Sequence, residues 1–284
     1  MKKLKIPLEN LTAKQIFLDC VAKCHDKDAL KRCADIVQED SDNYRAAAPL
    51  GLANFNYHSQ FPAGVTKTRL KEVYDNLFVP RKYFYDEILY QDEVCLCPVC
   101  DISEPSTLDH YLPKSVVPTV AVTPHNLVPM CARCNTVKSD KMETDVRRLP
   151  FHLYFDDFPN EPWLTVRFVA GAELAAHYVV RCPDDWDLVL KARLRRHMEL
   201  YDLETRFSIN ACREMTGKRK KWKRLLSARG VDALREEIQE EKISQEELDV
   251  NSWKAALYRG LEEHMDMLTN WLNADARTSL AEVG

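Results

Sequence analysis

The hydrophobic positions of the first ninety residues follow the spacing of helices. Apolar side chains recur three and four residues apart from Leu70 to Leu77, as one buried face of a helix over about 66–90 that is broken near Pro80. Farther upstream, Thr12-x-x-Gln15 has the form of a capping box ahead of an apolar run. The pattern predicts a helical N-terminal region.

Beyond residue 150 the apolar pattern changes twice. Residues 163–169 and 177–180 read as the strands of a hairpin joined through Gly171. Residues 253–271 instead carry an apolar stripe with the period of a helix, and 244–247 (Ser-x-x-Glu) has the form of another capping box. We therefore expect a short hairpin followed by helices, one of which begins near residue 244.

Between these regions, residues 91–150 combine prolines, dense cysteines and short apolar runs. The predicted fold class is mainly α with a small α+β insert. Its expected parts are a helical region over 1–90, the insert over 91–150, and a region over 151–284 that starts with the hairpin and continues as helices.

Composition narrows the class of protein. The 284 residues are 45% hydrophobic and 30% charged, which is ordinary for a protein with a packed core. No apolar run approaches the ~20 residues of a membrane span, and no signal peptide is recognisable, so we expect a cytoplasmic, bacterial protein without a membrane partner. The net charge of −4 means that any contact with nucleic acid must come from local patches or from a partner.

Five of the ten cysteines lie within a short part of the chain, and four of them form two C-x-x-C knuckles. The knuckles are Cys97–Cys100 and Cys131–Cys134, and together they offer the four thiolates of a tetrahedral structural zinc site. Cys95 beside them is interpreted as a bystander. A plain zinc ribbon has an inner gap of about 15–20 residues, whereas this gap is 30 residues long. The inserted segment therefore needs its own explanation.

The segment between the knuckles carries residues suited to metal-dependent hydrolysis. A short strand ending in Asp109 and His110, a returning strand from Asn126, and a helix after the second knuckle would bring Asn135 close to the strand end. The carboxylate of Asp109 and the amide carbonyl of Asn135 are hard oxygen ligands that suit Mg²⁺ or Mn²⁺. An imidazole such as His110 is suited to act as general base near neutral pH. The neighbouring His125 reads either as a second metal ligand or, as we favour, as a structural residue.

The order Asp109-His110, then Asn126-Leu-Val-Pro, then C-x-x-C-Asn135 with lysines behind it resembles the HNH endonuclease family, in its subset with a zinc-knuckle ββα-metal module. The resemblance implies that His110 is the general base, that Asp109 and Asn135 hold the catalytic metal, and that Asn126 pins the loop. Further candidate phosphate contacts are Lys114, Lys138 and Lys141.

The run 108–115, the Asn-Leu-Val-Pro sequence and the later Tyr154-Phe155-Asp156 are similar to the HNH subunit, PtuB, of bacterial Septu anti-phage systems, which also accompanies some retrons. The resemblance implies an effector nuclease with an ATPase partner like PtuA and, in a retron, a reverse transcriptase with its non-coding RNA. DNA is the favoured substrate. The alternatives are a tRNA- or RNA-cleaving effector, a stand-alone restriction or repair endonuclease, and a non-catalytic zinc-binding module.

A strongly basic run near residue 220 has two interpretations. It could follow a phosphate backbone with its indole stacked on a base, or it could be a solvated helix face or partner contact. Its members are Lys218, Arg219, Lys220, Lys221, Trp222, Lys223 and Arg224.

Overall fold

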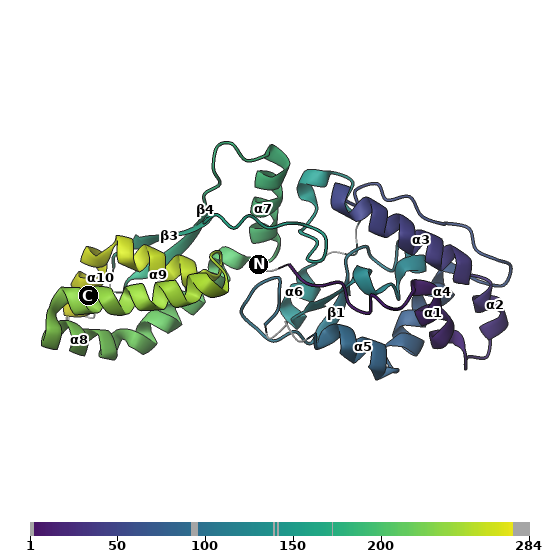
Figure 1. Ribbon diagram of the computed structural model, residues 1–284, viewed down its shortest axis with the longest axis horizontal. Coiled ribbons are helices and arrows are strands. Elements are labelled where there is room, and N and C mark those ends of the chain that lie inside the picture. The colour runs from purple at the N-terminus through teal and green to yellow at the C-terminus, as the bar shows by residue number, and fades with distance from the viewer. Residues whose placement is uncertain (1–2, 92–95, 139, 141, 172, 275–284) are drawn as a thin grey trace, which may run out of the picture. The chain divides into compact units, whose positions relative to one another are not determined.

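The computed structural model describes residues 3–91, 96–138, 140, 142–171 and 173–274 (Figure 1). Contacts divide the chain into two compact units. The N-terminal unit holds the described residues through Phe158 together with Leu188–Tyr201, and the C-terminal unit holds Pro159–Asp187 and the residues from Asp202 onward. The ranges 1–90 and 91–150, which the sequence pattern treats separately, thus lie in one unit. Mainly helical structure with small antiparallel sheets is confirmed.

The first ninety residues are helical, as predicted. The capping box at the start of the first helix is present: Thr12 Oγ1 accepts from the Gln15 backbone N–H at 3.1 Å, and the Gln15 side chain accepts from the Thr12 N–H at 2.7 Å. The expected long helix is interrupted by a π-helical turn, η2 (Tyr74–Phe78), ahead of Pro80. The α-helices here are α1 (Ala13–Val21), α2 (Lys27–Lys31), α3 (Ala34–Ala47), α4 (Lys67–Val73) and α5 (Lys82–Leu89), and a 3₁₀ turn, η1 (Ala48–Leu50), follows α3.

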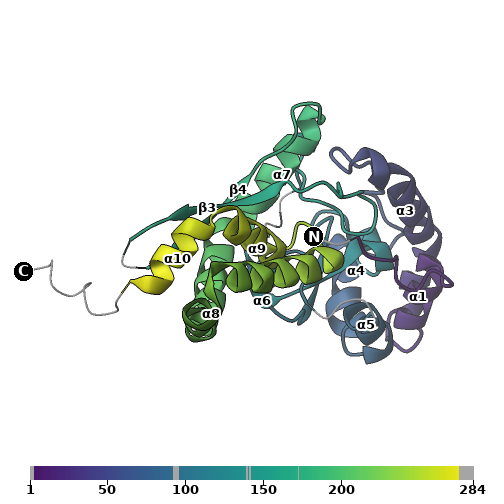
Figure 2. The ribbon, with the colours of Figure 1, turned by 60° about the vertical axis from the view of Figure 1, so that its left-hand side comes forward.

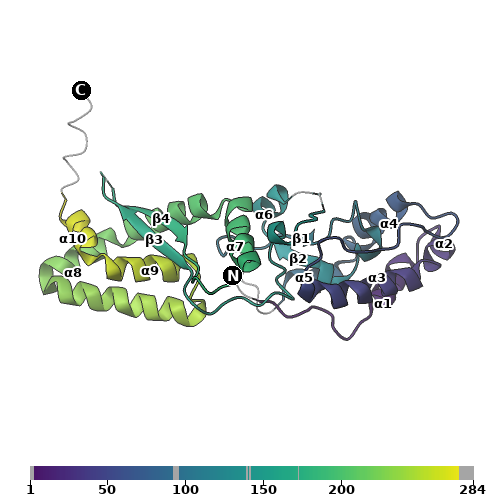
Figure 3. The same cartoon turned by 90° about the horizontal axis from the view of Figure 1, so that it is seen from above.

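The remainder of the N-terminal unit is built on a short antiparallel hairpin that leads into a helix (Figure 3). Strand β1 (Thr107–His110) pairs with β2 (Leu127–Met130), with Asp109 opposite Val128 and His110 opposite Leu127. The other elements are the 3₁₀ turns η3 (Pro118–Val120), η4 (Pro124–Asn126) and η5 (Val146–Arg148) and the helices α6 (Ala132–Val137) and α7 (Leu188–Leu200).

One hydrophobic core joins these parts. Buried side chains of α1, α4 and α5 belong to the same cluster as Leu108 of β1 and Leu127 of β2. Apolar burial of this kind is the main source of folding free energy, and it fixes the hairpin on the helices. The position of β1 is therefore set by residues almost a hundred positions upstream.

Helix α7 returns to the N-terminal unit through Arg193. Its guanidinium donates to both carboxylate oxygens of Asp156 and to the backbone carbonyls of Leu149 and Pro150, with Nη1 3.0 Å from Asp156 Oδ1. Both charged groups are largely buried, which makes such a satisfied pair costly to break. Because both of its carboxylate oxygens accept hydrogen bonds from Arg193, Asp156 has a structural role.

The C-terminal unit packs helices against the second hairpin (Figure 2). The predicted hairpin is present as β3 (Leu164–Val169) and β4 (Ala175–Val180), and the helices are α8 (Leu203–Leu248), α9 (Trp253–Glu263) and α10 (Met265–Asn273). The expected helix start at residue 244 is wrong, because α8 runs through it. The interruption lies instead at Gly230, whose φ of +84° suits glycine.

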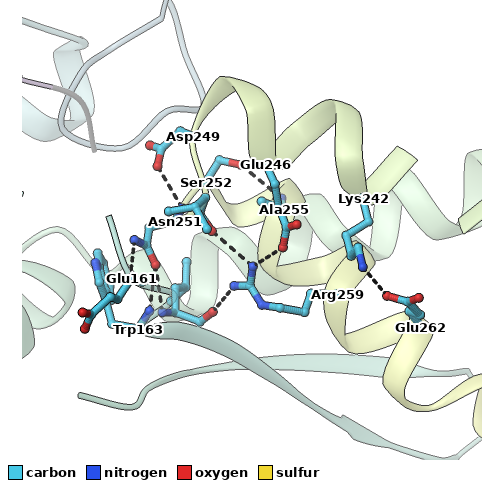
Figure 4. Close-up of polar contacts among 12 residues, drawn as sticks. Glu161, Trp163, Lys242, Glu246, Asp249, Asn251, Ser252, Ala255, Arg259 and Glu262 are labelled. Carbon is cyan, nitrogen blue, oxygen red and sulfur yellow. Dashed lines mark hydrogen bonds and ion pairs between the residues drawn. The ribbon is translucent and has the colours of Figure 1, made fainter. Parts of the chain in front are cut away.

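The connection between α8 and α9 is held by polar side chains (Figure 4). Asn251 Oδ1 accepts from the Trp163 N–H at 2.9 Å, and its Nδ2 donates to the Glu161 carbonyl at 3.0 Å. Arg259 lies 2.7 Å from Glu246 and donates to the Leu164 carbonyl at 2.8 Å. These contacts tie the ends of the helices to β3, so this unit has a defined packing of its own.

Among the helices in the described part of the chain, none has the length and apolarity required to span a bilayer.

Candidate functional site

The four knuckle cysteines converge in a buried cluster. Their sulfur atoms all lie within 4.8 Å of one another, and Cys100 Sγ is 3.9 Å from Cys131 Sγ. Tetrahedral zinc with Zn–S distances of about 2.3 Å places its sulfur ligands about 3.8 Å apart. The cluster could therefore hold a metal ion such as zinc.

The thiol chemistry fits the same conclusion. A hydrogen bond with Cys100 raises the pKa of Cys97 to about 12, and hydrogen bonds with Cys100 and Cys97 raise the pKa of Cys134 far above its ordinary value. Four adjacent thiolates repel one another unless a cation lies among them, and a bound cation favours the thiolate form. This donor set suits a structural metal ion.

The cluster positions the segment that follows it. Cys131 is the N-cap of α6, and its carbonyl accepts from the Asn135 N–H at 3.0 Å. On the other knuckle, His197 of α7 donates from Nε2 to the Val99 carbonyl at 3.1 Å. The second knuckle thus fixes the start of α6 and the backbone of Asn135.

A cavity of about 310 Å³ lies at the end of β1. It brings together Asp109, His110 and Asn135, and Lys114 and Lys138 also line it. The remaining lining residues were not singled out from the sequence; they are Tyr74, Val79, Tyr85, Thr107, Leu108, Pro113 and Asp140. The tyrosines come from helical elements far upstream and carry no local motif, whereas Asp140 follows the motif directly.

His110 has a fixed tautomer. Its Nε2 lies 2.9 Å from the carbonyl oxygen of Ala121, which can only accept, so Nε2 carries the proton and Nδ1 keeps its lone pair. The ring is buried and packs edge-on against Tyr74, with centroids 4.3 Å apart. Burial lowers the pKa of His110 to about 3, which keeps the ring neutral at physiological pH.

Asp109 is a buried carboxylate beside one cation. Lys138 Nζ lies 2.7 Å from Asp109 Oδ2, although this oxygen accepts no well-directed hydrogen bond from any described residue. Burial raises the pKa of Asp109, and the Lys138 charge opposes that shift. A carboxylate is a hard oxygen donor, so the chemistry of this group fits Mg²⁺ or Mn²⁺, with the cation in the place beside Oδ2 that the Lys138 ammonium occupies.

The amide of Asn135 is oriented by Thr107. The Thr107 hydroxyl donates to the Met130 carbonyl at 3.1 Å, so it can only accept from Asn135 Nδ2, which lies 3.1 Å away. The amide oxygen of Asn135 remains available as a second hard ligand. This arrangement suits the ligand role that the sequence predicts.

Asn126 does not line the cavity but holds the loop behind it. It is fully buried, its Oδ1 accepts from the Leu112 N–H at 2.8 Å, and its Nδ2 donates to the carbonyls of Leu112 and Val120, each at 3.1 Å. Val120 precedes the residue whose carbonyl accepts from His110. Asn126 therefore positions the support of the imidazole.

The other predicted residues near the site have diverse surroundings. Lys114 pairs with Asp75 and lies 4.5 Å from the ring centroid of Tyr74. His125 lies outside the cavity lining, and its Nε2 is 3.2 Å from the Ser41 carbonyl, as expected for a structural histidine. Lys141 and Cys95 lie outside the described residues.

The basic run lies in α8, and its indole does not have the predicted role. Trp222 is fully buried with its ring 6.4 Å from that of Tyr258, so stacking on a nucleic-acid base is wrong for this residue. Three cations of the run pair with carboxylates: Lys218 with Glu241, Arg219 with Glu173 and Lys221 with Glu237. The exposed members are Lys220, Lys221, Lys223 and Arg224, of which Lys221 pairs with Glu237; a contact of the run with nucleic acid stays a prediction.

Comparison with known proteins finds similarity to a phage protein. The chain is similar to protein ea31 of Escherichia phage lambda, with 29% identity over 220 residues, which cover 71% of this chain and 74% of the phage protein. No protein-family model matches the chain, and no solved structure matches it. The name of this relative states no activity, and the likeness brings none to this chain.

Proposed function

We propose that the protein is a metal-dependent HNH endonuclease that hydrolyses phosphodiester bonds in nucleic acid, with DNA favoured. The observation that carries the proposal is the convergence of Asp109, His110 and Asn135 on one cavity, beside an imidazole whose proton is fixed on Nε2. In this reading β1, β2 and α6 are the ββα-metal module, and the four-cysteine cluster holds structural zinc.

His110 acts as the general base in the proposed mechanism. Its Nδ1 takes the proton from the water that attacks phosphorus, while the Ala121 carbonyl keeps the ring in the required tautomer. A histidine with a pKa near 3 is a weak base, so the reaction also requires positive charge that stabilises the negative charge on the phosphate.

Asp109 and Asn135 would hold a divalent cation, Mg²⁺ or Mn²⁺. When bound, such a cation stabilises negative charge that develops on the phosphate and on the leaving oxygen. Lys114 and Lys138 line the same cavity, where they pair with Asp75 and Asp109, and they would supply positive charge for the phosphate when Asp109 holds the cation. These roles use oxygen ligands for the catalytic cation and sulfur ligands for zinc, in keeping with the preferences of the two metals.

The biological setting is also a proposal. The net charge of the chain is −4, so its own affinity for nucleic acid is weak and a partner can supply affinity or regulation. This favours an effector nuclease in a bacterial anti-phage complex with an ATPase subunit. The resemblance to PtuB supports this setting, including the retron-associated form with a reverse transcriptase and its RNA. RNA or tRNA as substrate is the second candidate, because the site recognises a phosphodiester and does not by itself specify the sugar.

The test uses purified wild-type protein with plasmid, single-stranded DNA and tRNA, each in Mg²⁺, Mn²⁺, Ca²⁺ or EDTA. We expect cleavage of at least one substrate in Mg²⁺ or Mn²⁺, and loss of cleavage in His110→Ala and in Asn135→Ala. His177→Ala, on the exposed face of β4, is the matched control and should retain activity. Zinc content and thermal unfolding show whether each variant is folded.

Cleavage by folded His110→Ala at the wild-type rate would exclude the proposed mechanism. Absence of cleavage with every substrate, with bound zinc retained, would favour a non-catalytic zinc module.

A further inference from the structure

A second cavity lies next to the candidate active site. It shares Pro113 and Lys138 with the first cavity, so the two cavities are neighbours. Its other lining residues come from the loop after β1, from the segment around η5 and from α7; they are Tyr111, Leu112, Met142, Glu143, Arg148, Leu149, Pro150, Arg196 and Leu200. The neighbouring cavity thus extends the site away from His110.

Positive charge predominates among the ionisable side chains of this cavity. Lys138, Arg148 and Arg196 line it, together with the single carboxylate of Glu143. Glu143 lies 3.3 Å from Arg148 Nε, and the Arg148 side chain is 59% exposed. Because Lys138 pairs with Asp109 and Arg148 pairs with Glu143, Arg196 is the cation of this cavity that has no ion pair with a described carboxylate.

Arg196 carries an unsatisfied donor. Its Nε is buried and has no hydrogen-bond partner among the residues that the structure describes. Arg193, one turn earlier on α7, provides the contrast, because its guanidinium is occupied by Asp156 and by backbone carbonyls. A buried N–H without an acceptor is destabilising, and because the Arg196 side chain lines the cavity, a ligand that enters there can supply the missing acceptor.

We propose that this second cavity binds a phosphate adjacent to the scissile phosphate of the nucleic-acid chain, with Arg196 and Arg148 as its ligands. A guanidinium matches the geometry of phosphate oxygens and can donate two parallel hydrogen bonds. Lys138 lines both cavities and so lies between the two phosphates. The inference rests on the proposed nuclease function and gives the path of the strand, from His110 past Lys138 to α7.

The test measures binding and cleavage separately. Binding of a fluorescent single-stranded oligonucleotide and of its duplex is followed by anisotropy over a range of KCl concentrations, in the His110→Ala background. The logarithm of the binding constant falls linearly with the logarithm of the salt concentration. Loss of one phosphate contact makes this slope less steep by about 0.7 for single strands and about 0.9 for duplex DNA. We expect this change, and about a tenfold fall in affinity, for Arg196→Gln and for Arg148→Gln.

Arg195→Gln is the matched control. Arg195 is the exposed neighbour of Arg196 on α7 and does not line the cavity, so the same change in charge should leave the slope unaltered. Arg196→Lys keeps the charge and should restore most of the slope. In the otherwise wild-type enzyme, Arg196→Gln should lower kcat/KM for an oligonucleotide about tenfold, with zinc content and thermal unfolding unchanged.

The outcomes separate the two proposals. If the wild type cleaves nucleic acid but Arg196→Gln and Arg195→Gln behave alike, the phosphate subsite is wrong and the nuclease function stands. A loss in Arg196→Gln that comes with lower stability and is not restored by lysine assigns Arg196 a structural role and also overturns the subsite. If the wild type neither binds nor cleaves nucleic acid, the proposed function itself fails.

Discussion

Replacing Asn126 by alanine tests whether the loop behind His110 is held as the structure indicates. The change removes three hydrogen bonds to described backbone groups, namely those to the Leu112 N–H, the Leu112 carbonyl and the Val120 carbonyl. Asn126 is 0% exposed, so water does not replace them without local opening. The loop would lose its anchor while the hydrophobic core of the unit stays unchanged.

The loss of stability in Asn126→Ala can be estimated from these three hydrogen bonds. Each buried backbone group left without a partner costs about 1–3 kcal/mol, and the effects of neighbouring groups are not additive. We expect the free energy of unfolding of the N-terminal unit to fall by about 3–5 kcal/mol. For a unit of this size, 1 kcal/mol corresponds to about 2–4 °C in Tm, so Tm should fall by roughly 10 °C.

Differential scanning calorimetry measures this change, and Asn135→Ala is the control. Asn135 has a part-buried hydrogen bond to Thr107, whose loss costs about 1 kcal/mol, but it is a proposed ligand of the catalytic cation. Asn126→Ala should therefore lose much stability, and Asn135→Ala should lose activity with little change in Tm. A melting temperature for Asn126→Ala within 2 °C of the wild type, on the scale of about 2–4 °C per kcal/mol, would refute the assigned role of the loop.

Three other predictions follow from the packing and the buried groups. Purified protein should contain zinc by elemental analysis, and Cys131→Ser should lose the metal and the fold of the N-terminal unit by circular dichroism; a metal-free wild type that keeps its fold would contradict this. Burial lowers the pKa of His125 to about 4, so the unfolded chain binds more protons below pH ~6.5, and stability should fall between pH 6.5 and 4 by up to about 1.4 kcal/mol per pH unit for this residue. Urea unfolding at pH 7 and pH 5 measures the fall, and His125→Gln should reduce it. Gly217→Ala in α8 has open space around the new methyl group and should stabilise the C-terminal unit by about 0.5–1 kcal/mol. Gly260→Ala in α9 would place a methyl group 3.2 Å from Phe168 and Val166 and should destabilise it by about 1 kcal/mol; equal Tm shifts for the two variants would exclude this packing argument.

Features that depend on the spacing of residues along the chain could be predicted from the sequence. The two C-x-x-C knuckles predicted the cysteine cluster, because the chain between them has to return before the second knuckle. The order of short strand, returning strand and helix placed Asp109, His110 and Asn135 on one cavity for the same reason. The residues of such a motif are brought together mainly by local geometry.

Features that depend on distant partners were not predictable. The run around Trp222 has the composition of a nucleic-acid contact, but its partners Glu173, Glu237 and Glu241 lie in other segments. Their positions become known only when the hairpin and both parts of α8 are packed. The helix start predicted at Ser244 was wrong for a related reason. The residues before Ser244 are also helical, so α8 continues through this position.

The return of α7 to the N-terminal unit has a consequence for biosynthesis. A ribosome has completed both strands of the β3–β4 hairpin before it releases Arg193 and His197, which anchor Asp156 and the first cysteine knuckle. The nascent chain therefore lacks part of the support of the candidate site until more than two thirds of the chain has been translated. The contacts that support the candidate site are therefore complete only late in synthesis, and a fragment terminated after residue 158 lacks both of these anchors.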